Sequence, residues 1–168
     1  LQKSAQALEQ FTQLVDLAER EKLDDGIKAA AYYGLGNIYY DEKNIESSQR
    51  NFEKCLEISK KLPKDQQGGL VEVYEKMARI MSLKGDFEKT GEYFSKKLDI
   101  ILELPKENAA EIARLCKAIV ICHRELNKDE AAIKYCEIAI KNLDDSLKED
   151  RLLIADFYIE LADIKSSE

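Results

Sequence analysis

The sequence is poor in the residues that interrupt helices. Its 168 residues include two prolines, seven glycines and no tryptophan. So few prolines and glycines leave few sites for the tight turns that a sheet of short strands requires. Charged residues make up 35% of the chain and hydrophobic residues 45%. The sequence is rich in Ala, Glu, Lys, Leu and Ile, which is typical of a mostly helical domain. The length corresponds to one ordinary domain, for which we expect an all-α fold.

Long apolar runs and an excess of positive charge are also missing. No apolar run approaches the roughly 18 residues of a membrane-spanning helix, and the start of the chain lacks the regions of a secretory signal. The formal net charge is −7, which disfavours a general attraction to nucleic acid or to an anionic membrane. Because the sequence starts at Leu1, inside an apparent helix, we expect it to be a segment of a longer protein.

A 42-residue repeat is the most informative pattern, since Leu62-Pro63-Lys64 recurs as Leu104-Pro105-Lys106. Such self-similarity indicates a solenoid, in which each unit packs on its neighbours. The positions of a first helix recur as Tyr32, Leu35, Gly36, Tyr39; Tyr74, Met77, Ala78, Met81; Cys116, Ile119, Val120, His123; and Tyr158, Leu161, Ala162, Lys165. The positions of a second helix recur as Ala7, Phe11, Leu14, Val15; Ser48, Phe52, Cys55, Leu56; Thr90, Phe94, Lys97, Leu98; and Ala132, Cys136, Ala139, Ile140.

These patterns predict eight helices in antiparallel pairs, because positions i, i+3, i+4 and i+7 lie on one helix face. A Gly or Asn, which can adopt the left-handed conformation needed after a helix, occurs in each of three turns: Lys43-Asn44, Gly85-Asp86 and Asn127-Lys128. Gly36 is expected to face Ser48 where two helices cross. The predicted helices span residues 5–22, 26–41, 44–61, 67–83, 86–103, 107–125, 128–143 and 148–166. The predicted organisation is a closing helix of a preceding repeat (1–25), three repeats (26–66, 67–106 and 107–147) and the first helix of a further repeat (148–168).

The repeat resembles the tetratricopeptide repeat, which places an aromatic residue, Leu-Gly and Tyr in its first helix and Ala, Phe and Ala in its second. The residues that carry the resemblance best are Tyr32, Leu35, Gly36, Tyr39, Phe52 and Leu56 in the first repeat, and Tyr74, Ala78, Gly85, Asp86, Phe87 and Phe94 in the second. The period is about eight residues longer than the standard one, as in kinesin light chains, the LGN spindle-orientation family and ciliary axonemal dynein-associated proteins. Residues 69–100 look most like the ciliary group. The resemblance implies a right-handed α-solenoid whose first helices line a concave groove.

Motifs typical of enzymes are missing from the sequence. It contains no glycine-rich phosphate loop and no Cys-x-x-Cys, Gly-x-Ser-x-Gly or His-Glu-x-x-His motif, which are the usual short signatures of such sites. A catalytic arrangement of the Ser-His-Asp or Cys-His type would depend wholly on the single histidine, His123. We therefore expect no catalytic residue, no cofactor and no enzymatic activity.

The four cysteines, Cys55, Cys116, Cys122 and Cys136, fall on periodic apolar positions of the predicted helices. This placement is typical of reduced thiols in a cytoplasmic protein. Cys116, His123 and Cys136 map to core positions of the third repeat, where a zinc site and simple core packing are both open interpretations. We favour core packing and expect no bound metal.

The candidate binding residues come from the groove positions that the resemblance implies for the first helices. They are Tyr33, Asn37 and Tyr40 in the first repeat, Lys76 and Arg79 in the second, and Arg114, Lys117 and Arg124 in the third. An Arg side chain can donate two parallel hydrogen bonds to one carboxylate. Five cations on two helices of an acidic chain therefore favour an acidic peptide or protein as the partner. The tyrosines add amphipathic contact surface. The other interpretation is a solvated face whose cations pair with Glu72, Glu75 and Glu125.

The expected function is that of a scaffold for protein–protein interaction within a larger complex. The resemblance places this scaffold in the cytoplasm, in a ciliary, dynein-associated or cytoskeletal assembly. The alternative is a peptide-sensing regulator whose repeats close around a short ligand and change curvature.

The choice between core packing and a zinc site at Cys116, His123 and Cys136 is open to a direct test. Elemental analysis of the purified protein should find far less than one zinc per chain, and a chelator should leave its circular dichroism unchanged, because structural zinc contributes directly to folding. Near-stoichiometric zinc would make the metal site the correct interpretation.

Overall fold

The computed structural model describes residues 2–63, 67, 69–103, 109–145 and 147–166. These residues form eight helices and no strand, so the predicted all-α class and the eight predicted helices are confirmed. The helices are α1 (Gln2–Arg20), α2 (Asp25–Asp41), α3 (Ile45–Ser59), α4 (Leu70–Leu83), α5 (Phe87–Leu102), α6 (Ala109–Glu125), α7 (Asp129–Asn142) and α8 (Lys148–Ser166). None of the described helices has the length and apolar character needed to cross a membrane.

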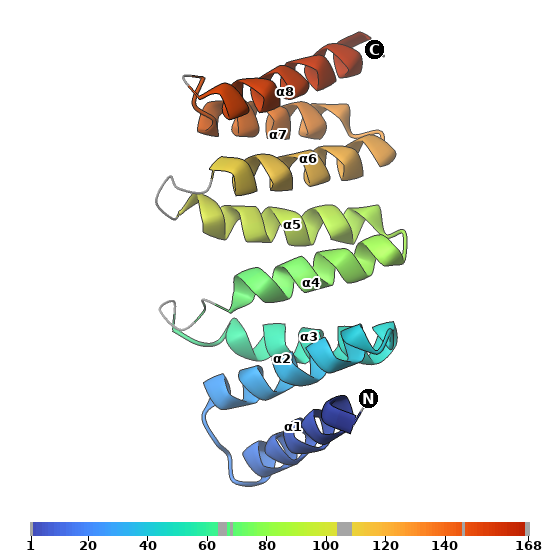
Figure 1. The fold of residues 1–168 in the computed structure, drawn as a ribbon, viewed down its shortest axis with the longest axis vertical. Coiled ribbons are helices and arrows are strands. Elements are labelled where there is room, and N and C mark those ends of the chain that lie inside the picture. The colour runs from blue at the N-terminus through green and yellow to red at the C-terminus, as the bar shows by residue number, and fades with distance from the viewer. Residues whose placement is uncertain (1, 64–66, 68, 104–108, 146, 167–168) are drawn as a thin grey trace. The chain divides into compact units, whose positions relative to one another are not determined.

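The chain forms two compact units, residues 1–80 and 81–168, and the division falls within α4. In the first unit α2 packs against both α1 and α3, and in the second α5, α6, α7 and α8 pack in chain order. Successive helices within each unit are antiparallel (Figure 1). These are the helix pairs of a helical solenoid. The predicted repeat boundaries stay a prediction.

The turns inside the helix pairs share one backbone geometry. Lys43, Gly85 and Asn127 have positive φ angles of 63°, 72° and 53°, which is the left-handed residue expected after a helix. The amide of the next residue bonds to the carbonyl five positions back, with N–O distances of 2.9 Å for Asn44 to Tyr39, 3.0 Å for Asp86 to Met81 and 2.8 Å for Lys128 to His123. The left-handed residue in the first turn is therefore a lysine, and its neighbour Asn44 has another role.

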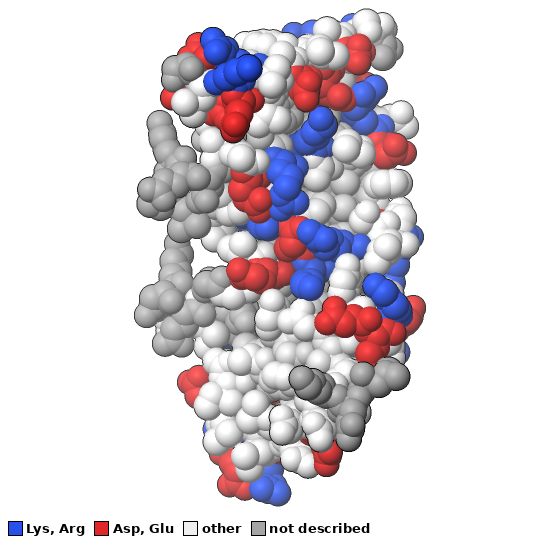
Figure 2. All heavy atoms as spheres, in the orientation of Figure 1, with Lys and Arg blue, Asp and Glu red and all other residues white. Residues whose placement is uncertain are grey.

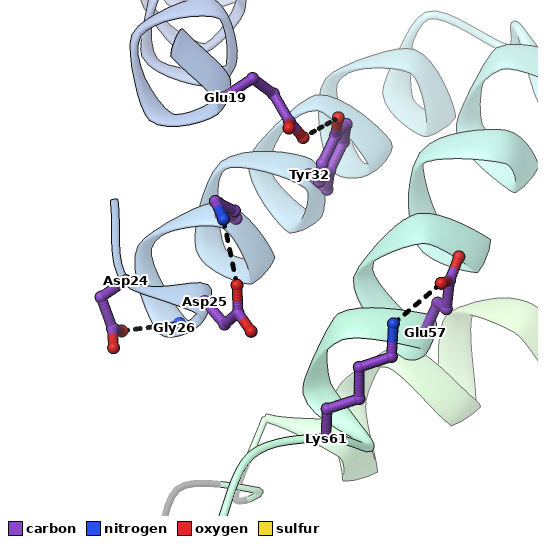
Figure 3. Close-up of polar contacts among 8 residues, drawn as sticks. Glu19, Asp24, Asp25, Gly26, Tyr32, Glu57 and Lys61 are labelled. Atoms are coloured by element: carbon purple, nitrogen blue, oxygen red, sulfur yellow. Dashed lines mark hydrogen bonds and ion pairs between the residues drawn. The ribbon is translucent and has the colours of Figure 1, made fainter. Parts of the chain in front are cut away.

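Polar side chains cap the starts of several helices. The Asn44 side chain accepts a hydrogen bond from the Ser47 amide at 3.2 Å, and that of Asp86 accepts one from the Lys89 amide at 3.0 Å. At the start of α2, Asp24 accepts a bond from the Gly26 amide at 2.7 Å (Figure 3). Each cap satisfies a backbone amide that has no partner within its helix.

Two glycines of α2 allow neighbouring helices to approach its backbone. The buried Ser48 hydroxyl donates a hydrogen bond to the Gly36 carbonyl at 2.8 Å, which confirms the predicted crossing. A Cβ atom at Gly36 would lie 2.6 Å from the Phe52 ring, and one at Gly34 would lie 2.5 Å from the Phe11 ring. No Cβ fits at such distances, so α1 and α3 both pack directly on bare backbone.

Replacing Gly36 should therefore separate α2 from α3. Gly36→Leu is expected to lower the free energy of unfolding by about 1–3 kcal/mol, the usual range for overpacking, as measured by urea denaturation. The matched control is Ala30→Leu, an exposed position on the same helix, which should leave stability nearly unchanged. Equal midpoints for Gly36→Leu and wild type would contradict this account of the crossing.

Candidate functional site

Tyr40 and Lys76, two predicted binding residues, lie together in the first unit. The Lys76 Nζ atom is 4.7 Å from the centre of the Tyr40 ring, a cation–π contact between α2 and α4. Arg79, one turn further along α4, pairs with Glu75 through an Nη2–Oε1 distance of 2.9 Å. The positive charge of Arg79 is thus already balanced by its own helix.

Tyr33 and Asn37 are half-buried on α2. The Tyr33 ring lies 5.9 Å from that of Phe52, tilted by 52°, so one side of Tyr33 belongs to the core. Its other side borders a pocket of about 310 Å³ that is also lined by Cys55 and Val73. Tyr33 therefore contributes to packing as well as to surface.

The larger hollow lies in the second unit, between α6 and α8, and is called here the α6–α8 groove. Its volume is about 810 Å³. Three of the predicted cations line it, because spacings of three and seven residues keep Arg114, Lys117 and Arg124 on one helix face. The polar lining is Arg114, Lys117, Arg124, Glu125, Asn127, Asp156 and Glu160. The apolar lining is Ala110, Ala113, Val120, Ile121, Leu153 and Phe157.

The cations of the α6–α8 groove are paired with carboxylates of the chain itself. Lys117 Nζ lies 3.6 Å from Asp156 Oδ2. Arg124 forms an ion pair with Glu160, whose hydrogen bond raises the Arg124 pKa. On the face that Figure 2 shows, blue and red side chains lie beside one another over α5–α8.

Arg114 is held by the carboxylate of Glu111, which also pairs with a buried lysine. Its Nε and Nη2 atoms each donate to Glu111 at 2.9 Å. The Glu111 Oε1 atom also lies 2.7 Å from Nζ of Lys97, whose side chain is only 8% exposed. These donors, Arg114 first, lower the Glu111 pKa from 4.5 to about 2 despite partial burial. Glu111 therefore balances the positive charge of the buried Lys97 and holds Arg114 at the edge of the groove.

Most of the predicted cations are thus paired with carboxylates of the chain, but these carboxylates differ from those expected. Among the carboxylates that pair with them, only Glu75 was predicted; Glu111, Asp156 and Glu160 were not. A charged Lys97 at a position filled by Cys55 and Ala139 in neighbouring repeats was the one signal that could have pointed to Glu111. A lysine at such a position requires a nearby carboxylate.

The cysteines are all buried and free of disulfides. Burial raises the pKa of the Cys116 thiol to about 12 and that of Cys136 to about 11. His123 stacks on Tyr135 with ring centres 5.5 Å apart, and burial lowers its pKa. Within the described part of the chain, no three His, Cys, Asp or Glu residues are grouped as metal ligands would be.

Comparison with known proteins agrees with this architecture. Residues 27–89 match the family model of the tetratricopeptide repeat, and repeats of this type generally present surfaces for binding other proteins. The crystal structure of BtubC (BKLC) from P. vanneervenii is similar in fold, with a TM-score of 0.56 and 18% sequence identity. The similarity covers 98% of this chain and 64% of that one, so this chain spans less than two thirds of BtubC. No curated protein matches the sequence.

The buried ion pair predicts a pH-dependent stability. Glu111→Gln leaves the Lys97 ammonium without its carboxylate and should lower the free energy of unfolding by about 1–3 kcal/mol at neutral pH, less than for a fully buried pair because Glu111 is partly exposed. Because the Glu111 pKa is lower in the folded state, its contribution is complete above pH 4.5 and is lost as the pH falls toward about 2. The difference between variant and wild type in urea denaturation should shrink over that range.

Two further variants complete this experiment. Glu92→Gln removes an exposed partner of Lys96 and should change stability by less than about 0.5 kcal/mol. Adding Lys97→Met to Glu111→Gln removes the buried charge and should restore most of the loss. If Glu111→Gln unfolds at the same urea concentration as wild type, Lys97 does not depend on Glu111.

Proposed function

We propose that this chain is a protein-interaction module and that its α6–α8 groove binds an acidic segment of a partner protein. The observation that carries the proposal is the meeting of Arg114, Lys117 and Arg124 along one groove of about 810 Å³. A groove of this size, with apolar and charged lining side by side, suits a peptide segment.

Carboxylates of the partner would replace those of α8. The side chains of Lys117 and Asp156 are 60% and 58% exposed, and surface ion pairs of this kind contribute only about 0–1 kcal/mol. Exchanging Asp156 for a partner's carboxylate therefore costs little. The guanidinium of Arg124 has five N–H donors, so it can bind a second carboxylate while Glu160 stays in place.

Apolar contact would add affinity at the same place. Ile121 lies in the groove and is 51% exposed. An apolar side chain of the partner that covers Ile121 is removed from water together with it. The preferred segment is therefore acidic and also carries an apolar anchor.

In the first unit, Tyr33, Asn37, Tyr40, Lys76 and Arg79 remain candidate contacts of the same chemical kind. The long-repeat subtype and the ciliary, dynein-associated setting rest on the resemblance of the sequence alone. The peptide-sensing alternative predicts that the protein compacts on binding, which small-angle X-ray scattering with and without peptide would reveal.

The groove can be tested with a fluorescent synthetic peptide that alternates Glu and Leu, and with a Lys–Leu peptide as its charge-reversed counterpart. The Glu–Leu peptide should bind with a Kd in the micromolar range, about 8 kcal/mol, and more weakly as salt is raised. Lys117→Glu with Arg124→Glu should weaken binding at least tenfold. The fold should persist, because both side chains are exposed and each of their ion pairs contributes only about 0–1 kcal/mol.

The matched control is Lys134→Glu, an exposed reversal on α7 outside the groove lining. It should bind the Glu–Leu peptide as wild type does. Equal weakening by Lys134→Glu would show that only net charge matters, and unchanged binding by the double variant would exclude the groove as the site.

A further inference from the structure

The pocket of about 310 Å³ beside Tyr33, called here the Tyr33 pocket, lies among α2, α3 and the start of α4 in the first unit. In the sequence repeat it corresponds to the α6–α8 groove, because lining residues of the two hollows match at a distance of two 42-residue repeats. Ala29, Ala30, Tyr33, Glu72 and Val73 line the Tyr33 pocket where Ala113, Arg114, Lys117, Asp156 and Phe157 line the groove.

The two hollows differ in charge at this matching position. In the α6–α8 groove, Lys117 of α6 pairs with Asp156 of α8. The Tyr33 pocket keeps the carboxylate, as Glu72 of α4, but Tyr33 stands where the lysine would be. The pocket therefore has an anionic group and lacks the cation that balances the equivalent group in the groove.

No other cation of the described residues replaces the missing one. Glu72 forms no ion pair and no hydrogen bond with them. Lys76 lies one turn further along α4, but its Nζ atom is 4.7 Å from the centre of the Tyr40 ring. The carboxylate of Glu72 is exposed at the mouth of the pocket and can bind a cation from outside.

Other polar groups that line the pocket already have contacts within the chain. The Ser59 Oγ atom lies 3.8 Å from Sγ of Cys55, and the side-chain amide of Gln67 donates a hydrogen bond to the Leu62 carbonyl at 2.7 Å. A ligand in the pocket therefore meets an open aromatic ring and an open carboxylate, beside an apolar lining.

We propose that the Tyr33 pocket binds the side chain of an arginine from a partner protein. A guanidinium can donate two parallel hydrogen bonds to the Glu72 carboxylate and stack on the side of the Tyr33 ring that borders the pocket. Its aliphatic stem then covers the apolar lining of Ala29 and Val73. The net charge of −7 also attracts a cation to the chain.

This inference goes beyond the proposed function, because it assigns a second site, in the other unit, to a ligand of opposite charge. A partner that uses both sites carries an arginine as well as acidic residues. Lysine is the poorer ligand for the pocket, because a compact ammonium does not form the paired hydrogen bonds of a planar guanidinium and is more strongly hydrated.

A nuclear magnetic resonance titration of the isotope-labelled 168-residue chain tests the proposal with the blocked pentapeptide Ala-Ala-Arg-Ala-Ala. The backbone amide signals of Ala29, Tyr33 and Val73 should shift progressively as this peptide is added. The same peptide with citrulline, a neutral isostere of arginine, should bind about three- to tenfold more weakly, because a charged hydrogen bond to an exposed carboxylate is lost.

Variants assign the effect to the two named side chains. Glu72→Gln should bind the arginine peptide no better than the citrulline peptide. Glu53→Gln is the matched control, because it removes one exposed carboxylate of α3 outside the pocket lining, and it should keep the preference for arginine. Tyr33→Phe keeps the aromatic ring and should bind as wild type does.

Several outcomes would overturn the proposal. They are equal affinity for the arginine and citrulline peptides, an unchanged preference in Glu72→Gln, and shifts confined to residues outside the pocket. Tighter binding of free arginine than of the pentapeptide would make the pocket a small-molecule site and exclude the partner protein. The signals come from the first unit, so each of these results leaves the test of the α6–α8 groove unaffected.

Discussion

The close approach of helix backbones at Gly36 is the constraint on which the first unit depends. A glycine there lets the Ser48 hydroxyl reach a main-chain carbonyl and lets the Phe52 ring lie against bare backbone. This contact fixes the rotation of α2 about its axis. Tyr33 and Tyr40 then lie off the crossing, and both keep part of their surface for other contacts. Access to a partner is thus a consequence of how the pair packs.

Several charged side chains of this protein stabilise its fold, and the ion pairs that they form compete with binding to a partner. Lys97 is buried, and a buried ammonium requires a carboxylate close by; Glu111 supplies it and also holds Arg114. Arg114 is therefore the least available of the groove cations. Lys117 and Arg124 pair across to α8 through exposed contacts, which exchange with solvent and ligands at little cost. The three cations of this row therefore differ: Arg114 is held by a carboxylate that also serves Lys97, whereas Lys117 and Arg124 can still bind a carboxylate of a partner.

α8 shows how one helix can serve two surfaces. Asp156 and Glu160 face the α6–α8 groove, whereas Ile154 and Tyr158 face a hollow beside α7. Residues two positions apart on a helix point about 200° apart, so the two sets are separated by the helix itself. The charged lining of the groove and the apolar lining of the hollow therefore lie on different sides of α8.

The helices and turns could be predicted from the sequence because their causes are local. The spacing of Tyr32, Leu35 and Gly36 and its recurrence sufficed to place the helix faces, and the turn residues marked the ends to within a few positions. Even locally, the left-handed position fell to Lys43 rather than to its neighbour Asn44, whose side chain is needed as a cap.

The geometry of the site was harder to predict from the sequence, because it depends on contacts between residues that are distant along the chain. Periodicity alone brought Arg114, Lys117 and Arg124 to one face, and the sequence determined this much. Arg124 and its partner Glu160 are 36 positions apart, and the pairing of Lys97 with Glu111 joins two helices. Only the tertiary structure decided which carboxylate balances which cation, because ion pairing depends on the distance between charges in space and not on their separation along the chain.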